Sequence, residues 1–170
     1  MSITKKLLDV TELETHIQTS RGVIKAVDKI SFSIYKGRTL GFVGETGSGK
    51  SMTAFSILKL FPSKEISIVS GNINYTTSED NIIDIASIPA NDKRIRKIRG
   101  KDISLVFQDS LSSLNPVYSI GYQISENIMN NKSVTKKEAY KISLDLITKV
   151  GISAPQKRIK QYPHELSGGM

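Results

Sequence analysis

The 170-residue chain is basic, with 24 Lys and Arg residues against 16 Asp and Glu residues and a formal net charge of +8 at pH 7. Hydrophobic residues at 38% and charged residues at 24% are typical of one soluble domain with a real core. No apolar run approaches the ~18 residues that a membrane span needs, and Asp9 interrupts the apolar pair Leu7-Leu8, which excludes an ordinary secretory signal. The absence of cysteine excludes a disulfide framework and a thiolate metal site. We therefore expect an intracellular protein.

The first part of the chain has the composition and the alternation of β-strands. Apolar and polar residues alternate over residues 30–34, as they do in a strand that buries one face. Strands are expected at residues 7–13, 23–27, 30–34 and 39–43. The last of them leads directly into the glycine-rich segment 44–49. Residues 50–61 are expected to form a helix that Pro62 ends.

The rest of the chain changes from β-strand patterns to helical ones. Residues 66–75 favour a further strand, and residues 76–92 are polar and loop-like, with room for a short strand at 82–85. A short basic helix is expected over residues 93–99 and an apolar strand over residues 103–107. From residue 119 to residue 150, apolar residues recur at helical spacing. The pattern indicates an α/β protein with a β-rich first part.

Six basic residues lie close together between β-like and apolar segments: Lys93, Arg94, Arg96, Lys97, Arg99 and Lys101. One interpretation is a patch for nucleic acid or for an anionic membrane. The other is the solvated face of a helix whose Ile95 and Ile98 pack inward. No aromatic residue lies among these charges, as the stacking of single-stranded bases would require. The solvated face is therefore favoured, and no nucleic-acid partner is expected.

The segment after residue 43 matches the pattern G-x-x-x-x-G-K-[ST] at every fixed position. Glycines allow the backbone to curl so that N–H groups point at phosphate oxygens, and the following helix adds its positive end. Lys50 is expected to reach the β- and γ-phosphates of ATP or GTP, and Ser51 to place its hydroxyl on Mg²⁺. The rival fingerprint G-x-G-x-x-G fails because Met52 stands where a glycine is required. The predicted nucleotide-binding residues are Gly44, Glu45, Thr46, Gly47, Ser48, Gly49, Lys50 and Ser51.

Two later motifs narrow the choice among the families of nucleotide-binding proteins. Gln108, at the end of the apolar segment 103–107, resembles the Q-loop of ATP-binding cassette (ABC) proteins, and Leu166-Ser167-Gly168-Gly169 resembles their signature motif. The order of P-loop, Q-loop and signature also fits that family, and the resemblance covers nearly the whole chain. The surrounding strings resemble the dipeptide, oligopeptide and nickel importer ATPases: Gly22-Val23-x-Lys25-Ala26-Val27-Asp28, Phe107-Gln108-Asp109, Ser113-Leu114-Asn115-Pro116, and Tyr162-Pro163-His164-Glu165 with Met170 after the signature.

The resemblance implies a P-loop NTPase fold of the ABC ATPase type, with an N-terminal antiparallel β subdomain. A nucleotide-binding core would occupy residues 1–108, and a helical subdomain ending in the signature motif would occupy residues 109–170. ATP and Mg²⁺ are the implied cofactors. Lys50 and Gln108 would take part in catalysis, and Ser51 and Gln108 would contact Mg²⁺. The signature residues Ser167, Gly168 and Gly169 would close over the ATP of an opposing subunit.

The same resemblance implies a set of partners and a place in the cell. The chain would pair with a second ABC ATPase subunit, for which a paralogue is favoured over a copy. It would serve two transmembrane permease subunits and, indirectly, an extracytoplasmic substrate-binding protein. It would hydrolyse ATP to energise import of peptides or nickel, as a peripheral protein on the cytoplasmic side of the cell membrane. The sequence does not separate a peptide substrate from nickel.

The chain departs from the family pattern at two places. An aromatic residue upstream of the P-loop normally stacks on adenine, and the matching segment here is Thr15-His16-Ile17-Gln18, where His16 could stack and Ile17 could only pack. The Mg²⁺-binding aspartate, the glutamate that orients water and the switch histidine belong after the signature motif, and the C-terminal part of the core is missing here. Asp80, Asp84 and Asp92 lie in a polar segment and do not replace that aspartate.

We therefore expect the 170 residues alone to be poorly soluble and nearly inactive in ATP hydrolysis. Phosphoryl transfer depends on positioned metal and water, and the missing strand would leave an unpaired edge and exposed apolar surface. A clean monomer that turns over ATP at the rate of the family, and loses this activity in Lys50→Ala, would contradict the expectation.

Two alternatives belong to other functional classes. A DNA-repair or ribosome-associated ABC ATPase would keep the nucleotide-binding fold without transport, and it would retain nucleic acid in a salt-sensitive way. A truncated nucleotide-binding module would bind nucleotide without turnover in a well-folded protein.

Overall fold

The computed structural model describes residues 5–109, 113–167 and 169–170. The chain divides into two compact units, Met1–Ile103 and Ser104–Met170. The division falls after Ile103, whereas the sequence analysis expected it after residue 108. Residues 104–108 therefore belong to the second unit and not to the first. Within the described residues, no helix is both long and apolar enough to cross a membrane.

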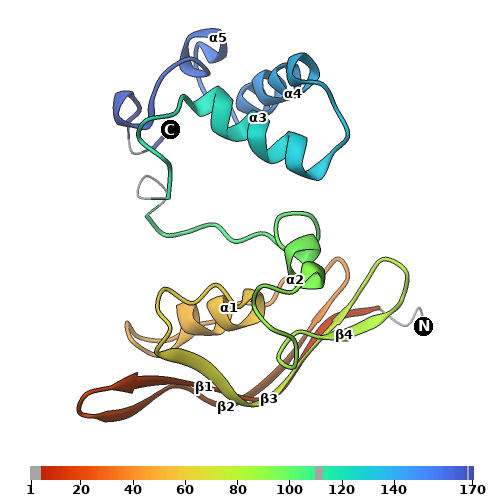
Figure 1. Cartoon of the computed structure of the whole chain (residues 1–170), viewed down its shortest axis with the longest axis vertical. Coiled ribbons are helices and arrows are strands. Elements are labelled where there is room, and N and C mark those ends of the chain that lie inside the picture. The colour runs from red at the N-terminus through yellow and green to blue at the C-terminus, as the bar shows by residue number, and fades with distance from the viewer. Residues whose placement is uncertain (1–4, 110–112, 168) are drawn as a thin grey trace. The chain divides into compact units, whose positions relative to one another are not determined.

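The first unit is built on an antiparallel sheet of four strands in the order β2-β1-β3-β4 (Figure 1). The strands are β1 (Lys6–Thr19), β2 (Gly22–Tyr35), β3 (Ile66–Thr76) and β4 (Ile82–Asp84). A tight turn joins β1 to β2, because Thr19 pairs with Gly22, and the pairing continues to Lys6 and Tyr35 at the far end. The two strands expected at 23–27 and 30–34 are thus one strand. The left-handed backbone of Lys29 (φ 49) lies between them, near shifts in the register.

The core of the first unit lies on one face of this sheet. β1 and β3 contribute Leu8, Val10, Leu13, Ile73 and Tyr75, all of them buried. The segment after β4 returns over the same face and adds further isoleucines, namely Ile85, Ile88, Ile95 and Ile98. Burial of such side chains is the main favourable term in folding, and it fixes which side of each strand faces inward.

Helix α1 (Lys50–Leu58) lies along the sheet and carries the glycine-rich segment at its start (Figure 1). A buried pair of hydroxyl groups joins α1 to β1, with Thr15 Oγ1 2.8 Å from Ser56 Oγ. Ser56 donates its own hydrogen to the Met52 carbonyl, so Thr15 is the donor in this pair. The helix ends before the expected residue 61 because Lys59 turns into the left-handed region (φ 49) and caps it.

Helix α2 (Lys93–Ile98) begins at Asp92, whose side chain accepts a hydrogen bond from the Arg94 N–H. Ile95 and Ile98 pack into the core, as the sequence predicted. Arg99 follows the helix and is structural: its Nε donates to the Leu58 carbonyl and its Nη2 to the Lys59 carbonyl, both at 2.8 Å. These two bonds cap the C-terminal end of α1 with a cation, the charge that this end of a helix favours.

Two expected strands are absent from the described residues. Residues 39–43 and 104–107 carry no strand hydrogen bonds, and only an isolated bridge joins Arg99 to Ile103. Val43 is fully exposed and Val106 is 88% exposed. An apolar segment becomes a strand only where a neighbour takes up its backbone hydrogen bonds, and no described strand pairs with either segment. The prediction of strands at 39–43 and 103–107 was therefore wrong for this structure.

The second unit is helical, with α3 (Ile120–Asn131), α4 (Lys136–Lys149), α5 (Pro155–Arg158) and a 3-10 turn η1 (Pro163–Glu165) (Figure 1). The helical pattern expected from 119 to 150 is divided into two helices. Thr135 begins α4 through a capping box with Glu138, in which each side chain bonds the other's backbone N–H. α3 and α4 pack together, with a buried hydrogen bond between Ser125 and Ser143 at 2.9 Å.

The backbone after α5 closes the second unit against the start of α3. The N–H of Ile120 donates to the Gln161 carbonyl and that of Gly121 to the Ile159 carbonyl, so two free N–H groups of the helix start are satisfied. A β-carbon at position 121 would lie 2.7 Å from the Ile159 carbonyl oxygen, so this close contact requires glycine. Ile120, Ile147 and Ile159 form the buried core beside it.

Replacement of Arg99 by methionine is expected to lower the free energy of unfolding of the first unit by about 2 kcal/mol, because it removes two charge-assisted hydrogen bonds to the end of α1. Urea denaturation followed by circular dichroism measures the change. Arg96→Met is the control: Arg96 is exposed on the same helix, and its loss should alter stability by less than about 0.5 kcal/mol. Equal effects of the two substitutions would contradict the capping role of Arg99.

Candidate nucleotide-binding site

The glycine-rich segment forms a compact loop immediately before α1. Residues Thr46 and Gly47 make a turn, and the Ser48 N–H donates to the Glu45 carbonyl at 3.2 Å. Gly47 and Gly49 both adopt a left-handed backbone with φ 86. Glycine takes this conformation without the steric cost that a side chain would add. The glycines at these positions are therefore required by the curl of the loop itself.

Gly49 is further constrained by β2. A β-carbon at position 49 would lie 2.4 Å from the Ala26 carbonyl oxygen, closer than any side chain can approach. Gly44 is constrained within the loop, where a β-carbon would lie 2.8 Å from Ser48 Oγ. The end of the loop is thus held directly against the backbone of β2, and this contact fixes where α1 begins.

Lys50 folds back over the loop that precedes it. Its Nζ donates to the Gly44 carbonyl at 2.6 Å, to the Glu45 carbonyl at 2.7 Å and to Ser48 Oγ at 3.1 Å. These three acceptors match the three donors of an ammonium group. The lysine predicted from the motif is therefore held at the loop with its charge next to the expected phosphate position.

The start of α1 provides a second source of positive potential. The first N–H groups of an α-helix have no partner within the helix, and here the first intrahelical bond runs from the Thr53 N–H to the Gly49 carbonyl at 2.8 Å. The first turn contains no acidic residue. Unpaired N–H groups, the positive end of the helix and Lys50 together make a site that favours an anion with several oxygen atoms.

A cavity of about 460 Å³ opens beside the loop. One side of it is the loop with Lys50 and Thr53, and the other is the β2 segment Lys25–Asp28 with Ile30 and Phe42. This volume lies within the range of small-molecule sites. Lys25 and Asp28 form an ion pair at 3.3 Å at its edge. The sequence analysis quoted the string 22–28 as a family resemblance but gave these side chains no role, because nothing in their spacing shows that β2 faces the loop.

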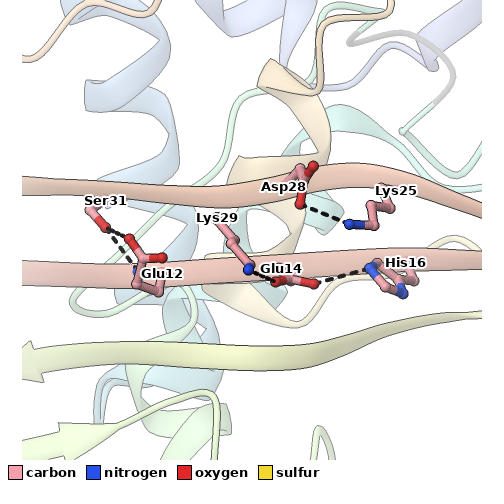
Figure 2. A network of polar contacts seen from close by, with 7 residues as sticks. All are labelled: Glu12, Glu14, His16, Lys25, Asp28, Lys29 and Ser31. Atoms are coloured by element: carbon pink, nitrogen blue, oxygen red, sulfur yellow. Dashed lines mark hydrogen bonds and ion pairs between the residues drawn. The ribbon is translucent and has the colours of Figure 1, made fainter.

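The segment expected to meet adenine lies elsewhere on β1. Thr15 is fully buried against Ser56, and none of residues 15–18 lines the described cavity. Figure 2 shows His16 beside Glu14. His16 Nε2 lies 3.3 Å from Glu14 Oε2 without forming a hydrogen bond. Lys29 Nζ reaches the other oxygen of Glu14 at 3.8 Å. An adenine contact by His16 or Ile17 stays a prediction.

Ser51 is exposed in the first turn of α1, next to the anion site. Among the described residues, no group of three His, Cys, Asp or Glu side chains could hold a metal ion. Mg²⁺ in nucleotide sites is held by one or two protein oxygen atoms together with phosphate oxygens and water. A single serine hydroxyl beside a phosphate cradle therefore fits Mg²⁺ that arrives with a nucleotide.

The remaining predicted site residues belong to the second unit. Gln108 is exposed, and its role at Mg²⁺ stays a prediction. Ser167 follows η1 and accepts a hydrogen bond on its carbonyl from the Met170 N–H at 2.9 Å. Gly169 has no atom within 4 Å of a would-be β-carbon, and Gly168 lies outside the described residues. The contact of these signature residues with the ATP of an opposing subunit also stays a prediction.

Comparison with known proteins identifies the family. A family model described as ABC transporter matches residues 27–170. The dipeptide transport ATP-binding protein DppD of Bacillus subtilis is 40% identical over 166 residues, which cover 98% of this chain and 48% of DppD. The oligopeptide transport ATP-binding protein AppD of the same organism is 43% identical over 164 residues, which cover 96% of this chain and 48% of AppD. The chain belongs to the ABC transporter family and spans about half the length of these relatives.

Solved structures share the fold. The dimeric ABC transporter cassette MJ0796 matches with a TM-score of 0.79 at 21% identity, over 96% of this chain and 64% of that chain. A post-hydrolysis state of MJ0796 bound to ADP and Pi matches with a TM-score of 0.76 at 18% identity. These similarities confirm the expected fold class, an ABC-type ATPase with an antiparallel sheet and helices.

Gly49→Ala is expected to weaken ATP binding by at least about tenfold, because the added methyl group meets the Ala26 carbonyl and the backbone is left-handed. Isothermal titration calorimetry measures the affinity. Gly41→Ala is the matched control, since nothing lies within 4 Å of a β-carbon at position 41 and its φ is ordinary. Unchanged affinity in Gly49→Ala would show that the loop does not depend on its contact with β2.

Proposed function

We propose that this chain is the nucleotide-binding part of an ATP-binding subunit that energises an ABC importer for peptides. The observation that carries the proposal is the loop at residues 44–49, where Lys50, two left-handed glycines and the start of α1 converge on one anion site. The peptide transport ATP-binding proteins among its relatives support the transport assignment. Nickel is the alternative substrate from the sequence resemblance.

In this proposal the polyphosphate of ATP lies in the loop. Its oxygens would accept from the N–H groups of Gly47, Gly49, Lys50 and Ser51 and from Lys50 Nζ, which would exchange the Gly44 and Glu45 carbonyls for phosphate. Ser51 would hold Mg²⁺ through its hydroxyl, and the ion would neutralise charge on the β- and γ-phosphates. The nucleoside then extends along the opposite wall of the cavity, which the β2 segment Lys25–Asp28 forms together with Ile30 and Phe42.

Hydrolysis of ATP needs residues that do not line this cavity. Gln108 would sense the γ-phosphate, and Ser167, Gly168 and Gly169 would contact the ATP of an opposing subunit. A second ATPase subunit, two permease subunits and, indirectly, a substrate-binding protein complete the proposed assembly at the cytoplasmic side of the membrane. ATP-driven closure of two such subunits would pass to the permease as a rigid-body movement of the helical unit.

The two other functional classes are separated by simple observations. A DNA-repair or ribosome-associated ATPase would retain nucleic acid in a salt-dependent way. A binding module would hold ATP without turnover even when its full reading frame is expressed. The relatives support neither alternative, since those compared are transport ATP-binding proteins.

Lys50→Ala is expected to weaken binding of both ATP and inorganic triphosphate by about 10- to 100-fold, because a charge-assisted contact to phosphate is lost. Lys25→Ala is expected to weaken binding of ATP by about threefold to tenfold and to leave binding of inorganic triphosphate unchanged, since in this proposal Lys25 contacts the nucleoside and not the phosphates. Calorimetric titration of each variant measures both ligands.

Three results would contradict the proposal. If ATP fails to bind the unmodified chain, or binds equally well to Lys50→Ala, the loop is not a nucleotide site. If ATP and inorganic triphosphate bind equally well, the nucleoside makes no contact along β2. Lys64→Ala, on an exposed lysine away from the cavity, is the matched control and should change neither affinity.

A further inference from the structure

Helix α2 presents two opposite faces of different character. Successive residues of an α-helix are rotated by roughly 100°, which places Lys93, Arg96 and Lys97 together and Ile95 and Ile98 on the opposite side. The two isoleucines are 1% and 2% exposed, so the orientation of the helix is fixed by the core. The three basic residues are therefore held toward solvent.

Lys101 lies in the loop that directly follows α2. The chain folds back there, because the N–H groups of Asp102 and Ile103 both donate to the Ile98 carbonyl at 3.0 Å. Lys101 is exposed in this tight loop. We call the surface formed by Lys93, Arg96, Lys97 and Lys101 the α2 basic face.

The acidic residues nearest in sequence do not neutralise this face. Asp92 is engaged by Arg94, with a bond of 2.8 Å from Nη2 and further bonds from Nε and the backbone N–H. Asp102 lies beside the Tyr75 hydroxyl, where burial and this carboxylate raise the pKa of Tyr75. Across the part of the chain that the structure describes, no carboxylate forms an ion pair with any of the four basic side chains.

Helix α2, which carries most of the α2 basic face, is fixed to the end of α1. Arg99, immediately after the helix, binds the carbonyls of Leu58 and Lys59 at the end of α1. Lys59 in turn donates its Nζ to the Ala86 carbonyl at 2.8 Å and to the Ile88 carbonyl. Three exposed cations thus lie on a fixed helix and a fourth lies in the adjoining loop, and an anionic surface would relieve the repulsion between them.

We propose that the α2 basic face binds the anionic phospholipid surface of a membrane. A bilayer with anionic headgroups offers many negative charges in a plane, which complements four cations on one outward face. Helix α2 carries no aromatic side chain on which bases could stack. This favours a lipid surface over single-stranded nucleic acid, and duplex DNA is the competing partner that the test below includes.

This binding would act beside the proposed assembly with a permease and does not require nucleotide. Each Lys or Arg near an anionic leaflet contributes about 1 kcal/mol, or about fivefold in the partition coefficient. Four residues supply a weak, reversible attraction that holds the ATP-binding unit near the bilayer. It should be lost at about 1 M salt, where screening acts within roughly 3 Å.

The test uses a quadruple variant in which Lys93, Arg96, Lys97 and Lys101 are each replaced by glutamine. Its matched control replaces Lys36, Lys64, Lys132 and Lys160, which are exposed lysines scattered over the chain, so both variants lose the same net charge. Co-sedimentation is measured with vesicles of phosphatidylglycerol and phosphatidylcholine and with vesicles of phosphatidylcholine alone. Calorimetric ATP binding, expected to be unchanged in both variants, reports on folding and on the nucleotide site separately.

We expect the unmodified full chain to sediment with the anionic vesicles only, and the quadruple α2 variant to lose at least tenfold in partition coefficient while the control loses less than threefold. Equal losses in both variants would show a net-charge effect and overturn the proposal. Tighter retention on duplex DNA than on anionic vesicles at the same salt would also overturn it, in favour of a nucleic-acid partner. If the quadruple α2 variant binds ATP normally and still binds vesicles like the unmodified chain, the α2 basic face is not the membrane-binding surface.

Discussion

The candidate site depends on one close approach, between Gly49 at the end of the phosphate loop and the Ala26 carbonyl on β2. No side chain fits between them, so the loop rests directly on the backbone of the sheet. Because α1 begins at the next residue, its positive end faces the cavity that β2 completes. The contact therefore joins the two things a nucleotide needs, an anion cradle and a wall for the nucleoside, which come from separate parts of the chain.

Two further interactions keep α1 in that position. Near its middle, Ser56 accepts the hydroxyl hydrogen of buried Thr15 and donates to the carbonyl of Met52. At its end, Arg99 binds the last carbonyls of the helix. A buried hydroxyl must be paired to avoid a desolvation penalty, so these polar contacts specify one position for the helix where apolar packing alone would tolerate small shifts. α2 is attached through the same arginine, which connects the outward basic surface to the helix that carries the site.

The second unit is also held together by a buried hydroxyl pair and by a close backbone contact at a glycine, but there the contact closes the start of a helix. Ser125 and Ser143 pair between α3 and α4 as Thr15 and Ser56 do between β1 and α1. Gly121 allows the Ile159 backbone to approach the start of α3 and to satisfy its N–H groups. The start of α3 is therefore closed by protein, whereas the start of α1 remains open toward its cavity. That contrast explains why the first helix is the candidate anion site and the second is not.

The sequence by itself determined the phosphate loop, the alternation over residues 30–34 and the inward packing of Ile95 and Ile98, and its motifs resembled those of the ABC family. The loop, the alternation and the packing rest on local spacing, which the chain carries without reference to other segments, whereas the family rests on the resemblance of several motifs. The sequence did not determine that residues 23–34 form one irregular strand, that residues 39–43 and 103–107 lack strand partners, or that Arg99 caps α1. It also left Lys25 and Asp28 without a role. These features depend on contacts between residues far apart in the chain, and only the tertiary structure decides which backbone groups and side chains meet.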